Sequence, residues 1–316
     1  MALCKSSGLA DPTCQLYMFF YALGPSTLIF PLLLQGTKWP SWKPILKAAG
    51  ICLFDIFCTV SNYTGASKAG PTLFSIVYSS VTIWTAVFSQ LFLKRRLRLW
   101  QWLAVVTVFG GLAFTATDTL QLGDDVTLGV AMIFVGSAMH ALTYIMSEGI
   151  MTISEETLTV RQNNVVQALV AATTLLLWQL YYTLPRWEEK IGRPMQASGT
   201  TCLHALQVLL LFSLSNLVHS STFFHTLAYF PGGSTSAGVM KGLQAVLVFV
   251  ITHFAFCGRI GGQEMCFSRT KLVSLVTVSG GVVGYGMATS FYLSSKTRRP
   301  FRDVKKALTP STGHMA

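Results

Sequence analysis

Long apolar stretches follow one another along most of the 316-residue chain, with short polar connections between them. A helix needs about 20 predominantly apolar residues to cross a hydrocarbon core about 30 Å thick. Nine stretches meet this requirement, at roughly 15–35, 45–66, 71–93, 100–118, 126–149, 163–184, 203–229, 234–257 and 271–293. The pattern predicts an all-α polytopic membrane protein without an attached soluble domain.

Composition and charge support this prediction. The chain is 52% hydrophobic and only 11% charged, too apolar for a soluble domain with a charged surface. Its net charge of +11 is therefore read as an orientation signal, not as a nucleic-acid surface. If loop 36–44 is cytosolic, fourteen Lys and Arg residues lie on that side and eight on the other. We expect the basic C-terminal tail, 294–316, in the cytosol.

The two halves of the chain share a weak internal similarity. Val106–Gly111 matches Val276–Gly281 at an offset of 170, and Gly70-Pro71-Thr72 matches Gly233-Ser234-Thr235 at an offset of 163. The third and eighth predicted spans cross the membrane in opposite directions, so the duplication is an inverted repeat, as in many transporters. The predicted division is an N-terminal segment 1–14, a first repeat 15–118 of four helices, a second repeat 126–293 of five, and the tail.

The fifth span, 126–149, has no partner in the first half. The pattern therefore predicts a ten-helix fold whose first helix is missing. Either the sequence is a truncated isoform or gene model, which we favour, or the lineage has lost this helix.

Several short motifs point to a known family. They are Asp55; Asn62 to Ser67; Tyr78 to Ser89; Phe92 to Leu97; Gln101 to Leu103; Gly129, Ser137 and Glu148; Lys241-Gly242; and Gly280-Gly281 with Tyr285-Gly286. This set resembles the EamA-like drug/metabolite transporter superfamily, in particular its nucleotide-sugar transporters and orphan solute carriers. The resemblance implies exchange of a cytosolic nucleotide sugar for a lumenal nucleoside monophosphate in the Golgi or ER membrane, without ATP.

The resemblance also bears on the substrate. Nucleotide-sugar transporters of the sialic-acid and galactose type have the Lys-Gly pair that Lys241-Gly242 reproduces. They also have a lysine three residues after the tyrosine that Tyr78 resembles, and here that position is Val81. One of the two expected cations is thus absent.

Lys241 is the main candidate for substrate contact. It lies about two turns inside an apolar helix, and an ionisable residue at membrane depth is expected to face a cavity or a partner. We expect it to bind an anionic group such as phosphate; the alternative is a structural ion pair with Asp55. Asp55 is in turn either a proton or cation coupling site or only the partner of Lys241.

Further polar and aromatic residues are predicted to line the same site. Asn216, His219 and Ser220 form one stripe of the seventh span, which either lines a cavity or joins helices. Tyr63 and Tyr78 are candidates for contact with a nucleotide base, and Asn216 and His219 for contact with sugar or ribose hydroxyls. The remaining candidates for substrate binding are Asn62, Gln244 and Tyr285.

Other polar groups have simpler interpretations. Cys257 and Cys266 either form a disulfide in the loop 258–270 or remain free thiols. We expect His140 and His253 to be satisfied by neighbours and the sequon at Asn62 to be unmodified, because it lies too close to the membrane. The diglycines Gly110-Gly111 and Gly280-Gly281 are expected to allow close helix packing.

The motifs of membrane and soluble enzymes are absent: there is no paired intramembrane aspartate, no His-Glu-x-x-His and no nucleotide-binding loop. We therefore expect no enzyme activity, no cofactor and no metal. The expected partners are a small-molecule substrate and the lipid bilayer, with a homodimer as one option for assembly, but no nucleic acid.

Two other functions compete with nucleotide-sugar exchange. One is a proton-coupled or facilitative carrier of amino-acid-like or cationic solutes in a vacuolar, plastid or plasma membrane, with Asp55 as its coupling group. The other is an inactive, truncated protein that only associates with partners.

Overall fold

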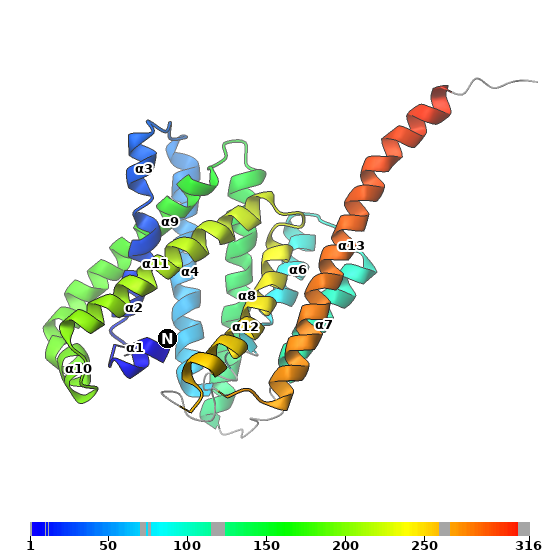
Figure 1. The fold of residues 1–316 in the computed structure, drawn as a ribbon. Coiled ribbons are helices and arrows are strands. Elements are labelled where there is room, and N and C mark those ends of the chain that lie inside the picture. Colours follow the sequence, from blue (N-terminus) through cyan, green and yellow to red (C-terminus); the bar gives the residue numbers. More distant parts are fainter. Residues whose placement is uncertain are drawn as a thin grey trace, which may run out of the picture.

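The protein is a bundle of helices in a computed structural model (Figure 1). The structure describes residues 2–308 except 10, 12, 70–73, 75–76, 115–123 and 259–265. Its longer helices are α2 (Leu16–Ser26), α4 (Trp42–Ala69), α6 (Val81–Phe92), α7 (Leu99–Ala113), α8 (Asp124–Thr152), α9 (Val160–Trp178), α11 (Cys202–Tyr229), α12 (Ser234–Phe256) and α13 (Arg269–Leu308). The short ones are α1 (Ala2–Ser6), α3 (Ile29–Leu34), η2 (Gln179–Thr183), η3 (Leu184–Arg186), η4 (Glu188–Gly192) and α10 (Arg193–Ala197).

Seven helical stretches of the described residues are long and apolar enough to cross a membrane: Leu16–Leu34, Trp42–Ala66, Val126–Thr152, Val160–Arg186, Cys202–Tyr229, Ser234–Ala255 and Arg269–Ser290. Each corresponds to a predicted span. The predicted third and fourth spans correspond to the shorter apolar helices α6 and α7, and the rest of those two spans lies largely outside the described residues. The predicted all-α polytopic membrane fold is confirmed.

Helix α13 is longer than the span that it contains. The membrane-spanning part, Arg269–Ser290, agrees with the ninth predicted span, and the helix continues to Leu308 and projects beyond the other helices (Figure 1). The basic segment that follows the span is rich in residues that favour helices, so the helix extends through most of the predicted tail.

Helix packing relates the first four spans to the last four. α2 packs on α9, α6 on α12 and α7 on α13. The contact of α4 with α9 corresponds to the contact of α11 with α2. This is the pairing expected when two similar halves are related by a two-fold axis. The residue bounds of the two repeats stay a prediction.

Helix α8 is the exception to this pairing. It packs between α4 and α6, and within the described residues no helix takes the equivalent place beside α11 and α12. Large apolar side chains of both helices are exposed, among them Leu214 and Val218 on α11 and Leu247 and Ile251 on α12.

Glycines allow the closest helix crossings. A Cβ at Gly65 would lie 2.7 Å from the carbonyl oxygen of Gly129, and a Cβ at Gly129 would lie 2.8 Å from that of Gly65, so α4 and α8 touch backbone to backbone. In the two diglycines, Gly111 and Gly281 pack closely between α7 and α13, whereas Gly110 and Gly280 face open space.

Candidate functional site

Lys241 lies seven residues into α12, about 10 Å along its axis. Its Nζ is 3.0 Å from Nε2 of His219 on α11 and 5.5 Å from the centre of the Phe223 ring. A neutral imidazole can accept a proton from the ammonium, and an aromatic face attracts a cation. The lysine is therefore turned toward α11, where it contacts an imidazole and an aromatic ring, neither of them anionic.

Asp55 on α4 contacts helix α8. Its Oδ1 is 2.9 Å from Nδ1 of His140 and accepts a hydrogen bond of 3.0 Å from the hydroxyl of Thr143. No ion pair within 4.0 Å joins Asp55 to Lys241 among the described residues. The direct Lys241–Asp55 pair considered from the sequence is thus not formed, because α8 supplies both partners of the carboxylate.

A run of rings connects the acidic and basic groups. Ring centres are 5.9 Å apart for Tyr78 and His140, 4.9 Å for His140 and Tyr144, 4.5 Å for Tyr144 and Phe223, and 6.1 Å for Phe223 and His219. Asp55 contacts this run at His140 and Lys241 contacts it at Phe223 and His219. One cluster, which we call the ring cluster, therefore unites Tyr78, Asp55 and Lys241.

Tyr63 joins the ring cluster indirectly. Phe74 stacks on Tyr78 with ring centres 5.3 Å apart and on Tyr63 at 6.3 Å. Tyr63 also makes an edge-on contact with Tyr17 of α2, with ring centres 6.2 Å apart. Both tyrosines predicted to contact a base thus belong to one continuous aromatic surface.

The residues of the polar stripe of α11 have different partners. The Asn216 side-chain amide donates a 2.7 Å hydrogen bond to the carbonyl of Tyr21 on α2, and Ser213 donates to that of Phe20. Ser220 donates to the carbonyl of Leu217 on its own helix, at 3.5 Å. Within this stripe, His219 contacts Lys241, and Asn216 joins two helices.

Three further predicted residues lie apart from Lys241 in their contacts. Asn62 is buried on α4, with its amide against Gly136 of α8. Gln244 is exposed on α12. Tyr285 of α13 is buried near the first turn of α12, where a Cβ at Gly232 would lie 2.7 Å from its hydroxyl.

Gly242, beside the lysine, packs against a helix in this structure. A Cβ there would lie 2.4 Å from the side chain of Val108 on α7. Of the two roles considered for this glycine, close approach of a ligand or of a neighbouring helix, the structure shows the second.

Arg95 and Glu148 were recognised in the sequence only as parts of longer motifs. The two form an ion pair, and Glu148 also accepts a 2.7 Å hydrogen bond from the backbone N–H of Ser234. The signal available in the sequence was the carboxylate of Glu148 within an apolar span, because an ionisable group inside a membrane usually has a partner.

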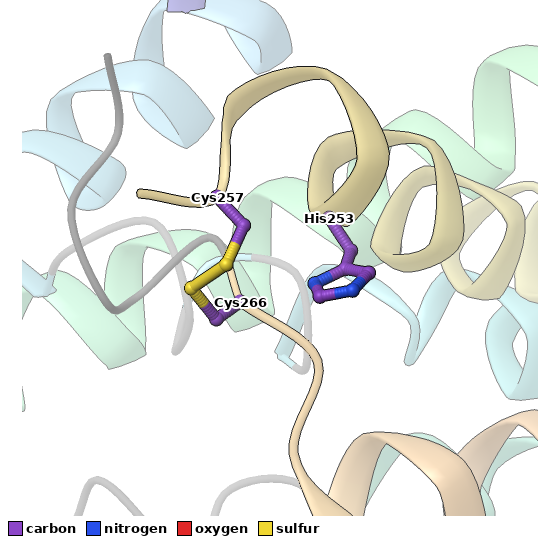
Figure 2. Close-up of side chains that lie close together, drawn as sticks. All are labelled: His253, Cys257 and Cys266. Carbon is purple, nitrogen blue, oxygen red and sulfur yellow. A yellow bond between two sulfur atoms is a disulfide. The ribbon is translucent and has the colours of Figure 1, made fainter. Parts of the chain in front are cut away.

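Cys257 and Cys266 form a disulfide at the far end of α12, which decides between the two predicted alternatives (Figure 2). His253 lies beside them, and its Nδ1 accepts a 3.1 Å hydrogen bond from the backbone N–H of Phe267, as expected for a satisfied histidine. The ligand atoms of the three residues lie within 4.8 Å of one another, a spacing that a metal ion also needs. Here, however, the two sulfur atoms are bonded to each other.

A cavity of about 380 Å³ lies elsewhere, between the N-terminal segment, η4, α10 and α11. It is mainly apolar, with Leu9, Trp187, Met195 and Leu206 among its lining residues. Leu206 and His219 are thirteen residues apart on α11, or about 20 Å. This cavity is therefore distinct from the ring cluster.

Part of the chain is similar to a known family, and its fold is similar to that of a solved structure. The model of the EamA-like transporter family matches residues 9–117. One solved crystal structure, described only as that of a protein, is 14% identical, with a TM-score of 0.63 over 92% of this chain and 93% of its own, which shows a similar fold. The comparison with curated proteins gives no match.

The family match lies in the first half of the chain, where the motifs around Asp55, Tyr63 and Tyr78 were recognised. It supports the resemblance to the drug/metabolite transporter superfamily over this part of the chain, and the seven apolar helices support an integral membrane protein.

Proposed function

We propose that the protein transports a small organic anion by alternating access, and that nucleotide-sugar and nucleotide exchange is its activity. The observation that carries this proposal is the environment of Lys241: a cation at membrane depth in contact with a histidine and an aromatic ring. A lysine with no carboxylate within 4.0 Å among the described residues is suited to an anionic ligand group, because a charge in the membrane needs a close partner.

Each part of a nucleotide has a matching surface in the ring cluster. Lys241 binds phosphate, with His219 as a hydrogen-bonding neighbour. The surface of Tyr78, Phe74 and Tyr63 offers aromatic faces on which a base stacks. We assign no direct substrate contact to Asn216 or Tyr285, because Asn216 binds α2 and Tyr285 packs beside the first turn of α12.

The cellular setting follows from the same proposal. An exchanger of this kind resides in the Golgi or ER membrane with its C-terminus in the cytosol, and it needs no ATP. The excess of Lys and Arg on the side of loop 36–44 supports this orientation. Assembly as a homodimer stays a prediction from the sequence.

A second candidate function has an observation in its favour. Asp55 and His140 form a pair of titratable groups within the ring cluster, and 35% of the Asp55 side-chain surface is accessible. A carboxylate so placed can bind a proton or the amino group of a substrate. A carrier of amino-acid-like solutes, with Asp55 as its coupling group, is therefore the alternative.

The test is uptake of UDP-galactose into proteoliposomes loaded with UMP. Lys241→Ala should abolish uptake, while Lys271→Ala, a change at a lysine outside the ring cluster, should leave it near the wild-type level. Wild-type rates in Lys241→Ala would refute the assignment. Uptake of an amino acid that depends on a proton gradient, and that Asp55→Asn eliminates, would establish the alternative.

A further inference from the structure

Glu148 is a carboxylate with no accessible surface, near the end of α8. Burial of an ionised carboxylate costs several kcal/mol unless partners compensate it. Arg95, from the connection between α6 and α7, forms an ion pair with it, and the backbone N–H of Ser234 donates a 2.7 Å hydrogen bond to its Oε2. A single side chain thus joins α8, the α6–α7 connection and the first turn of α12.

The surrounding backbone is adapted to this contact. Gly233 has φ +48°, and a Cβ there would lie only 2.1 Å from Oε1 of Glu148, so a side chain at this position would displace the carboxylate. Lys94 also has a positive φ, of 53°, and this turn ends α6 just before Arg95. The negative charge faces the N-terminal end of α12, where the helix dipole favours an anion.

The same contact is connected to Lys241. Ser234 and Lys241 are seven residues apart, which is two helical turns, so they lie on nearly the same side of α12. Between them, Ala237 packs in a buried cluster with Tyr144, one turn before Glu148 on α8. Tyr144 in turn meets Phe223, the ring beneath the lysine. The way α12 is held against α8 therefore determines where the ammonium of Lys241 lies.

We propose that Glu148 is a positioning residue for substrate binding: it holds the first turn of α12 and so sets the place of Lys241 in the ring cluster. This inference rests on the proposed function, because it assumes that Lys241 binds the transported anion. Glu148 itself does not touch the substrate. Its loss changes the KM for the anion through a shift of α12.

The experiment measures the KM for UDP-galactose uptake into UMP-loaded proteoliposomes. Glu148→Met keeps the size of the side chain but removes both contacts, and it should raise KM about tenfold, equivalent to about 1.4 kcal/mol. Glu148→Gln keeps an oxygen that can accept from Ser234, and it should raise KM only about threefold. The matched control is Glu155→Gln, an exposed glutamate after the same helix, which should keep the wild-type KM.

KM separates positioning from a purely structural role, because it does not depend on how many carriers are folded. A lower yield of folded protein with a wild-type KM would overturn the inference. If Glu148→Met does not fold, Gly233→Ala provides the second variant, because its Cβ collides with the carboxylate. Gly199→Ala is its control, since φ is also positive there, at +65°, but no atom lies within 4 Å.

The outcomes distinguish this inference from the proposed function. Full uptake by Lys241→Ala would refute the proposed function, and with it the premise of the inference. Lack of uptake by the wild-type protein would have the same effect. An inactive Lys241→Ala together with a wild-type KM in Glu148→Met would refute the role of Glu148 alone.

Discussion

His140 Nδ1 lies 2.9 Å from Oδ1 of Asp55, so the carboxylate of α4 is paired with α8 and not with the lysine of α12. Thr143 donates a hydrogen bond to the same oxygen from one turn further along α8. The acidic and basic groups of the ring cluster thus have separate partners. Lys241 therefore has no carboxylate within 4.0 Å among the described residues, and the Asp55–His140 pair can be tested as a local contributor to stability.

Mutations of Asp55 and His140 should have non-additive effects on the free energy of unfolding. His140→Ala leaves the carboxylate with Thr143 alone and should lower the free energy of unfolding by about 1–2 kcal/mol, less than for a fully buried pair because Asp55 is partly accessible. In the double variant His140→Ala/Asp55→Asn the unpaired charge is gone, so most of this loss should be recovered. Thermal unfolding of the purified protein in detergent measures both variants.

The effects of His140→Ala, of Asp55→Asn and of the double variant on the free energy of unfolding are compared. If the two single effects add up to that of the double variant, the contact between His140 and Asp55 does not stabilise the fold. The matched control is His225→Ala on α11, an exposed histidine whose ring contact is with Tyr229, which should change stability by no more than about 0.5 kcal/mol.

A second prediction concerns the crossing of α4 and α8 at Gly65 and Gly129. Gly129→Ala places a Cβ 2.8 Å from the carbonyl oxygen of Gly65 and 2.9 Å from the backbone nitrogen of Ala69, so the helices must separate. We expect a loss of about 1–3 kcal/mol, as for overpacking of a core. Gly149→Ala on the same helix meets no atom within 4 Å and should be neutral or slightly stabilising. Equal melting temperatures for the two variants would contradict this role of the crossing.

Much of the fold is predictable from the sequence because the membrane imposes a simple length and polarity rule on helices. Seven of the predicted spans correspond to spanning helices among the described residues, and the other two correspond to the shorter apolar helices α6 and α7. The rule does not predict the extension of α13 to Leu308, since helix propensity continues where hydrophobicity ends. Nor does it predict the relation of α4 to α8, which depends on Gly65 meeting Gly129 in three dimensions.

The candidate site was only partly predictable. Charge at membrane depth was a sufficient signal for Lys241 and Asp55, but not for their separate partners, because His140 and Phe223 come from other helices. Periodicity placed Asn216 and His219 on one stripe, yet their contacts differ, with α2 and α12 respectively. Spacing along one helix cannot show which neighbour each position meets.

The last prediction concerns pH and the segment before α2. Burial raises the pKa of Asp11, but hydrogen bonds from Thr13 and the charge of Lys190 outweigh it, so the pKa lies below the ordinary value of 3.8. A carboxyl group with a lowered pKa adds stability that is fully present above its unfolded pKa and is lost as the pH falls through the folded value. Asp11→Asn should therefore lower the melting temperature by about 2 °C at pH 7, and the difference from wild type should shrink as the pH falls below 3.8. A difference for Asp11→Asn that stays constant as the pH falls would show that the loss comes from the shape of the turn and not from the charge of Asp11.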